Sequence, residues 1–448
     1  MNRKTLLLTT LLLTGTASAT WANDVWTLND CIEHAMKNNI KLKKSKLNAS
    51  SADTDVKTAK AALLPSLSAS TTQSVAYRPF QESAAQFVNG SKTSSSSNKT
   101  SQSGSYGINA SWTVWNGGRN VKEIKAKKID YEKALLSLET EANDIQEQIA
   151  QLYVQILYSS EAVAVNEALL EKDEAEYERG KALLEEGKLS RSELSQLESQ
   201  LMAGRYDVVN SKVQVADYKL KLKQLLELTE QDDIRIEPLN VTEETVKATI
   251  PDKNAVYTNA LANRPEIKSS ILNREASKID LSIAKAGYLP TIRLTAGIGD
   301  NHMTGTSETF FDQMKQNLNG SAGVTISIPI FSNRENRSAV EKAKINQLTS
   351  ELDLQDQQKN LYNSIETYWL NATSNQQKYI AACSNVQSAQ INYDKMDEQF
   401  RLGLKNIVEL TTSRTTLLNA QQEMLQSKYL TLLYMQMLKF YGGEKLNL

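Results

Sequence analysis

The chain has 448 residues, with 51 Lys or Arg and 52 Asp or Glu, so its formal net charge is −1. A charge so near zero argues against nucleic acid as a partner, because phosphate binding needs a basic surface. The two histidines, His34 and His302, have no metal-ligand spacing to each other or to the two cysteines, so we expect no metal and no cofactor.

The first 22 residues predict a secretory signal peptide. Arg3 and Lys4 precede a short apolar run, and small residues end at Ala19 and Ala22. This order indicates cleavage after either alanine, and the apolar run is too short to span a membrane. Cleavage leaves 49 basic and 52 acidic residues, a net charge of −3.

Helical and strand patterns then follow one another. Apolar spacing predicts helices over residues 27–39 and 41–64, and a period of two predicts strands over residues 66–77 and 107–115. The serine-rich residues 91–105 between the strands predict a flexible loop. Cys31 and Cys383 are too few for a disulfide framework, and we expect two separate thiols rather than a bridge.

Residues 121–185 predict one very long helix. They contain no proline, and apolar residues recur every seven positions at Leu135, Ala142, Ile149, Ile156, Val163 and Leu170. At 1.5 Å per residue this helix would be roughly 98 Å long. Its many Glu, Lys and Gln side chains exclude a membrane span. The helix breaks around Gly187, and a second heptad helix over about 190–225 returns, which makes a helical hairpin.

The same plan returns after a mixed linker at 227–252. The sequence AKAALLP at 59–65 is matched by AKAGYLP at 284–290, and residues 107–120 match residues 323–336. Strands are predicted at 291–299 and 324–330 around a polar loop at 300–321, before a second long helix at 337–401. We therefore expect two structural repeats, residues 23–240 and residues 241–448 with a C-terminal tail.

Each repeat supplies two strands with alternating polar and apolar residues, a pattern typical of a membrane barrel wall. Trp112, Trp115, Ile326 and Ile328 are the predicted lipid-facing side chains. Four strands cannot close a barrel, and an open edge in lipid is untenable, so copies of the chain must share one. Two copies would give eight strands and three would give twelve. The alternative is a pair of soluble hairpins capping a coiled coil.

The duplicated A-K-A-x-x-L-P before a strand, the strand exits into long helices and the glycine-centred tips followed by an acid resemble the TolC-type outer membrane efflux proteins, also called outer membrane factors. The resemblance covers essentially the whole mature chain. It implies a homotrimer with a twelve-stranded β-barrel in the outer membrane and a helical tunnel in the periplasm. It also implies a periplasmic adaptor protein and an inner-membrane pump as partners.

The segment at 403–410 is similar to the family's G-x-R-x-x-V-D-V tip, with Lys405 at the basic position and Glu409 at the acidic one. Glu193 takes the acidic place in the first half. The resemblance implies that Glu193, Lys405 and Glu409 line the periplasmic aperture and gate. It makes Gly187 and Gly403 the hairpin-tip turns and adaptor contacts. Alternatively, both acids are solvated residues at helix starts, where the helix dipole favours them.

A passive exit duct is therefore the leading hypothesis, the outer membrane channel of a tripartite efflux or type I secretion system for small molecules or proteins. No catalytic or nucleotide-binding motif is present in the sequence, so we do not expect an enzyme. The competing hypothesis is a secreted or surface coiled-coil protein, structural or adhesive, without channel activity.

Overall fold

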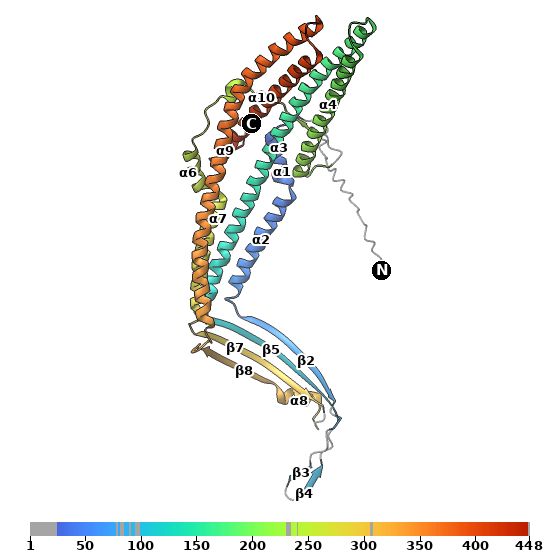
Figure 1. Ribbon diagram of the computed structural model, residues 1–448. Coiled ribbons are helices and arrows are strands. Elements are labelled where there is room, and N and C mark those ends of the chain that lie inside the picture. Colours follow the sequence, from blue (N-terminus) through green and yellow to red (C-terminus); the bar gives the residue numbers. More distant parts are fainter. Residues whose placement is uncertain are drawn as a thin grey trace, which may run out of the picture. The chain divides into compact units, whose positions relative to one another are not determined.

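The computed structural model describes residues 25–77, 79–80, 85–88, 91–94, 99–229, 234–239, 241–304 and 308–446 (Figure 1). The predicted signal peptide lies outside these residues. The chain forms two compact units that cut across the two sequence repeats. The first contains Met1–Ile40, Ala142–Tyr257 and Ser364–Leu448, and the second contains Lys41–Glu141 and Thr258–Asn363.

The second unit contains a four-stranded antiparallel sheet in the order β2-β5-β7-β8 (Figure 1). Its strands are β2 (Ser66–Tyr77), β5 (Thr100–Asn116), β7 (Thr291–Met303) and β8 (Asn319–Ser327). All four predicted strands are present, but the strand predicted at 324–330 begins earlier, at Asn319, and ends at Ser327, where its pairing with β7 stops. Two short strands, β3 (Ala85–Val88) and β4 (Ser91–Ser94), pair separately with each other. Because β2 and β8 end the order, each leaves one edge without a partner strand among the described residues.

The two loop predictions were too long. Residues 100–105 belong to β5, because all of them pair with β2 and residues 103–105 also pair with β7, so their backbone hydrogen bonds are satisfied despite their serine-rich composition. Residues 91–94, also inside the predicted loop, form β4. Part of the region 300–321 is a helix, α8 (Phe310–Asn317). The Thr309 hydroxyl caps α8 by accepting the amide of Asp312, a local signal that the polar composition concealed.

Four helix ends meet one end of this sheet. They are the last residues of α2 (Ile40–Ala61) and α7 (Pro265–Ala286) and the first residues of α3 (Arg119–Glu185) and α9 (Glu335–Arg401). Helices α3 and α9 have 67 residues each, about 100 Å at 1.5 Å per residue, which confirms the predicted long helices. The short helix α6 (Lys253–Asn263) precedes α7.

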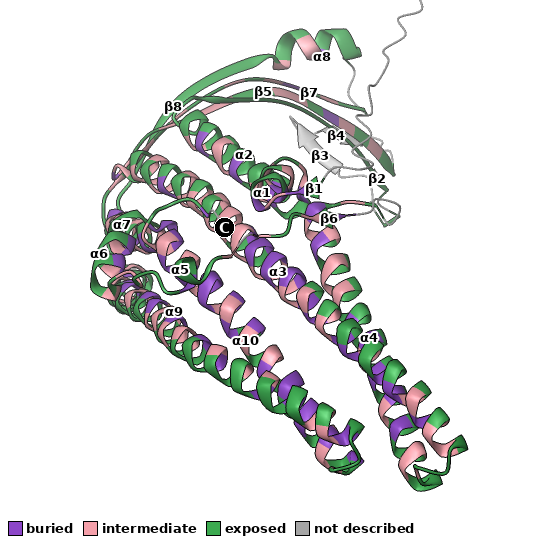
Figure 2. Cartoon of the chain, turned by 90° about the horizontal axis from the view of Figure 1, so that it is seen from above, coloured by how far each residue is buried: buried purple, intermediate pink, exposed green. Residues whose placement is uncertain are grey.

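The first unit contains the far parts of α3 and α9 with their returning helices, α4 (Arg191–Leu226) and α10 (Ile407–Tyr441). It also holds α1 (Leu28–Asn38), the short helix α5 (Glu243–Val246), and a parallel pair of β1 (Val25–Trp26) and β6 (Arg235–Ile236). The predicted linker at 227–252 therefore contains β6 and α5. Buried and exposed positions alternate along all four long helices (Figure 2).

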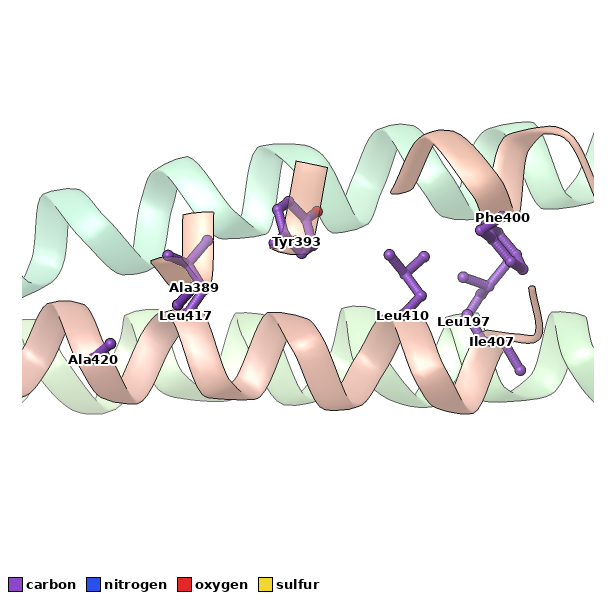
Figure 3. Packing of buried hydrophobic residues seen from close by; sticks show 8 residues of the cluster. All are labelled: Leu197, Ala389, Tyr393, Phe400, Ile407, Leu410, Leu417 and Ala420. Carbon is purple, nitrogen blue, oxygen red and sulfur yellow. The ribbon is translucent and has the colours of Figure 1, made fainter. Parts of the chain in front are cut away.

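The apolar core of the first unit includes a cluster where the helices approach their tips. Leu197 of α4 packs there with Tyr393 and Phe400 of α9 and with Leu410 and Leu417 of α10 (Figure 3). No helix in the described ranges is both long and apolar enough to cross a membrane. Cys31 and Cys383 are free thiols, as expected.

Candidate functional site

Each long helix ends in the same backbone turn. The glycines that follow the helices are in the left-handed region, with φ of +69° at Gly187 and +73° at Gly403. In both turns the next residue donates its amide to the carbonyl five positions back, over 2.8 Å from Lys188 and 2.9 Å from Leu404. A Cβ added at either glycine would meet nothing within 4 Å, so the positive φ rather than lack of space favours glycine.

Glu193 forms a capping box at the start of α4. Its Oε2 accepts the amide of Ser190 at 2.9 Å and the Ser190 hydroxyl at 2.7 Å, and its own amide donates to Ser190 Oγ at 3.2 Å. These bonds to the ionised carboxylate hold the pKa of Glu193 below its ordinary value, with the serine hydroxyl contributing most.

Glu409 repeats this arrangement at the start of α10 and adds a cation. Its Oε2 accepts the amide of Asn406 at 3.3 Å, and its amide donates to Asn406 Oδ1 at 3.0 Å. Its Oε1 accepts from Lys405 Nζ at 2.5 Å. The bond from the Lys405 ammonium is the main reason that the pKa of Glu409 is lowered.

Of the five predicted tip residues, the structure thus joins Lys405 and Glu409 directly. Glu193 bonds to Ser190, and no hydrogen bond in the described parts of the chain links it to Lys405 or Glu409. Both acids lie at helix starts, as the alternative to an aperture role expected, and both cap the helix through the bonds described above. A role in a gate stays a prediction.

A buried polar network that was not among the predicted site residues joins three of the helices near the tips. Arg414 of α10 donates from Nε to Asp173 Oδ1 of α3 at 2.8 Å, and from Nη2 to Asp173 Oδ2. Gln200 of α4 donates to the same Oδ1 at 2.7 Å and accepts from the Thr411 hydroxyl at 2.6 Å. The network therefore connects the first helical hairpin with the second.

The Asp173–Arg414 pair lies deep in the protein, with side-chain exposures of 2% for Asp173 and 8% for Arg414. Burial raises the pKa of Asp173, against the opposing effects of Gln200 and Arg414. Gly204 of α4 provides the space, because a Cβ there would lie 2.8 Å from Asp173 Oδ2 and 3.4 Å from Arg414 Nη2.

A sequence signal for this network existed in the heptad pattern. One seam of α3 begins with Leu138, Ile145 and Leu152 and continues at the same spacing with Ser159, Asn166 and Asp173. The three polar members are all buried. Polar residues on an apolar seam indicate a buried polar contact, although not its partner, since Arg414 is 241 residues away.

A second buried carboxylate on α3 meets α9. Glu176 Oε1 accepts from Arg401 Nη2 at 3.2 Å, and Arg401 also pairs with Asp397 on its own helix at 2.9 Å. Burial, followed by the nearby charge of Asp397, raises the pKa of Glu176. The contacts of Asp173 and Glu176 with the second hairpin are therefore both ionic and close to the tips.

The sheet of the second unit has two chemically distinct faces. Side chains directly opposed across the ladder share a face, and the opposed sets on one face are apolar. They are Trp115–Ile292–Ile326, Trp112–Leu294–Val324 and Leu67–Ala110–Ala296–Ala322. The intervening sets are polar or small: Thr113–Arg293–Thr325, Ser66–Ser111–Thr295–Gly323 and Ser68–Asn109–Gly297–Ser321.

A β-bulge places Trp112 and Trp115 on the same face. Simple alternation would put them on opposite faces, but the register shifts between Thr113 and Trp115. Trp112, Trp115 and Ile326 are exposed on the apolar face, as a lipid-facing role requires. Ile328, also exposed, lies just after the end of β8 at Ser327, where the strand pairing has stopped.

Comparison with known proteins identifies similar chains. Residues 31–227 and 256–443 match the family model described as Outer membrane efflux protein. The chain is 26% identical over 216 residues to the Outer membrane protein TolC of Escherichia coli (strain K12), covering 46% of this chain and 43% of that protein. That match therefore spans less than half of the length of TolC.

Two further matches cover nearly the whole chain. It is 21% identical over 440 residues to the Toxin and drug export protein A of Aggregatibacter actinomycetemcomitans, covering 94% of this chain and 90% of that protein. The crystal structure of the Campylobacter jejuni CmeC outer membrane channel superposes with a TM-score of 0.76 at 19% identity, covering 94% and 87% of the two chains. This likeness confirms the fold class expected from the sequence.

Proposed function

Because the chain belongs to the outer membrane efflux protein family, we propose that it is the outer membrane channel of a tripartite efflux or type I secretion system. The outer membrane location expected from the sequence is confirmed by that membership. The channel is a passive exit duct for small molecules or proteins, and a relative named for toxin and drug export supports this range of cargo.

The observation that carries the proposal is the sheet with one apolar face, one polar face and two unpaired edges. In a bilayer, the edges of β2 and β8 must find partner strands, since unsatisfied backbone groups are costly in lipid. Four strands are too few for closure, so copies of the chain pair edge to edge. Two copies would give eight strands, whose interior is filled by side chains, whereas three copies give twelve strands around a lumen lined by the polar face. A duct therefore favours three copies, the homotrimer that the family resemblance implies.

Helix α4 carries a second surface for such an assembly. Met202, Val209 and Val213 lie on an exposed apolar stripe, with exposures of 48%, 61% and 60%. The positions 216 residues later in α10, Leu418, Leu425 and Tyr429, are all buried.

Tyr429 shows what covers the stripe in the second repeat, because its hydroxyl donates to Glu161 of α3 at 2.6 Å. By the internal duplication, the counterpart of α3 is α9. We therefore assign the α4 stripe to a contact with α9 of the neighbouring copy. In the trimer, α9 of the neighbouring copy would then cover the α4 stripe, as α3 covers the equivalent residues of α10 within one chain.

The hairpin tips are the proposed site of control. Three copies of Glu193, Lys405 and Glu409 line the periplasmic aperture and form its gate, and the turns at Gly187 and Gly403 contact a periplasmic adaptor that connects to an inner-membrane pump. Acidic rings in a narrow pore favour cations. The energy for transport comes from the pump, so the duct itself performs no catalysis.

The decisive experiment is purification from outer membranes in detergent, followed by mass measurement and reconstitution in planar bilayers. A trimer with single-channel conductance is expected. Val209→Glu should dissociate the trimer, whereas Asn210→Glu, on the neighbouring exposed position, should not. A soluble monomer without conductance would overturn the channel and favour the secreted coiled-coil alternative.

A second experiment separates the aperture role of the acids from their capping role. Glu193→Gln with Glu409→Gln removes charge, whereas Ser190→Ala with Asn406→Ala removes the capping partners and leaves both charges. An aperture role requires reduced cation preference in the first double variant only. Equal cation preference in wild type and both variants would leave capping as the sole role.

A further inference from the structure

The helices that meet the sheet carry an uneven distribution of charge. Residues Ser66, Asn116, Thr291 and Ser327 lie at the same end of the sheet, as the strand register shows. Helices α2 and α7 end shortly before Ser66 and Thr291, and helices α3 and α9 begin shortly after Asn116 and Ser327. All of these segments belong to the second compact unit.

The ten residues of each helix nearest to the sheet contain twelve basic and six acidic side chains in total. The opposite ends of the hairpins have the reverse balance. There, the last ten residues of α3 and α9 and the first ten of α4 and α10 contain six basic and nine acidic side chains. The sheet end therefore carries an excess of positive charge and the tips an excess of negative charge, in a chain whose overall charge is near zero.

Six lysines at the sheet end form what we call the basic collar: Lys60, Lys125, Lys128, Lys285, Lys342 and Lys344. All six are exposed. None forms a salt bridge within the described segments, whereas the neighbouring Arg119 and Arg337 pair with Glu123 and Glu341 at 2.7 and 3.0 Å. The collar is thus available to an external anion.

Aromatic side chains lie between the apolar face of the sheet and the collar. Trp115 is 48% exposed at the end of β5, Tyr288 is 50% exposed just before β7, and Phe331 is 84% exposed after β8. Tryptophan and tyrosine favour the boundary between hydrocarbon and headgroups, and lysines just beyond that boundary reach the headgroups with their long side chains. The apolar, aromatic and basic side chains therefore follow one another in the same order as the hydrocarbon, the boundary region and the headgroups of an anionic leaflet.

We propose that the basic collar binds the headgroup phosphates of anionic phospholipids in the leaflet at the sheet–helix junction. This proposal depends on one part of the proposed function, the location of the sheet in the membrane. A lysine near an anionic leaflet contributes roughly fivefold in affinity, and the attraction extends over about one Debye length, about 8 Å at physiological salt. The collar anchors the depth of the sheet without any contact to the tips.

The test compares the wild-type trimer with a collar variant, Lys125→Gln, Lys128→Gln, Lys342→Gln and Lys344→Gln. The matched control variant has the same charge change in the other unit, with Lys188→Gln, Lys212→Gln, Lys378→Gln and Lys395→Gln. Each protein is reconstituted in vesicles of phosphatidylcholine with about one third phosphatidylglycerol. Native mass spectrometry after extraction then measures the ratio of the two lipids retained.

We expect wild type and the control variant to retain phosphatidylglycerol at least tenfold above its bulk ratio, and the collar variant to retain it near the bulk ratio. High salt should abolish the enrichment for wild type. Equal enrichment in the collar and control variants, or none in wild type, would overturn the proposal. Conductance and outer membrane fractionation are measured in parallel, because their loss in wild type would count against the channel itself rather than against the collar.

Discussion

Arg414 of α10 and Asp173 of α3 form a buried two-point ion pair between the two helical hairpins, with one contact of 2.8 Å. Removing two charges from water is costly, and only mutual pairing and further hydrogen bonds offset that cost. Gln200 supplies one such bond. Loss of one partner should therefore destabilise the protein much more than loss of both partners.

Asp173→Ala should destabilise the protein by about 3–5 kcal/mol, because it leaves the Arg414 guanidinium buried without its carboxylate. The double variant Asp173→Leu with Arg414→Met should lose far less, since no buried charge remains. Denaturant unfolding of the detergent-solubilised protein measures both. Equal losses in the two variants would show that packing rather than charge pairing dominates.

Gly204→Ala tests the space beside this pair. The added Cβ would lie 2.8 Å from Asp173 Oδ2, so the pair must shift or the helices must separate. We expect a loss of about 1–3 kcal/mol, although alanine is the better helix former. Ser199→Ala, at an exposed position of the same helix, should stay within about 0.5 kcal/mol of wild type and serves as the control.

The glycines at the tips should tolerate asparagine better than alanine. Their φ values of +69° and +73° cost an alanine about 1–2 kcal/mol, whereas asparagine adopts this conformation more readily. Amide hydrogen exchange in the last turns of α3 and α9 should therefore rise most for Gly187→Ala and Gly403→Ala. Exchange at α1, away from the tips, should not change.

Acid should loosen the starts of α4 and α10. The pKa values of Glu193 and Glu409 are lowered in the folded protein, so their capping contribution is complete above the ordinary value of 4.5 and is lost as pH falls through the lowered value. Amide protection in these first turns should fall on acidification relative to Glu193→Gln and Glu409→Gln. Unchanged relative protection would contradict the role of the ionised caps.

The raised pKa of Asp173 makes its contribution to stability depend on pH in the opposite direction. Its protonated form is favoured in the folded state relative to the unfolded chain, so its own contribution to stability decreases as pH rises through the carboxyl range. Loosening of the tips by acid therefore has its source in the capping carboxylates. Asp173→Asn should leave the pH dependence of the α4 and α10 first turns in place.

Cys31 should resist alkylation in the folded protein. It is fully buried, and burial raises the pKa of its thiol to about 12, so almost no thiolate is present near neutral pH. Cys383 is only partly buried and should react first with iodoacetamide. Equal rates for the two thiols under native conditions, measured by mass spectrometry, would contradict this arrangement, and unfolding should expose both.

The sequence by itself determined the elements and their repetition. Seven-residue spacing without proline predicted both long helices, and a period of two predicted the four strands, because these patterns depend on neighbours along the chain. The turns at Gly187 and Gly403 were also evident, since a left-handed residue after a helix is a local requirement. Local composition was misleading in the two predicted loops, where serine-rich residues 100–105 belong to β5, residues 91–94 form β4 and residues 310–317 form α8.

The tertiary structure decided which side chains meet. Asp173 and Arg414 are 241 residues apart, and no pattern along the chain could have paired them or shown that Gly204 makes room for them. The shared face of Trp112 and Trp115 depends on a bulge in the ladder with β7. The physical reason is the same in each case: periodicity is encoded by near neighbours, whereas register, ion pairing and available space arise only when distant segments pack together.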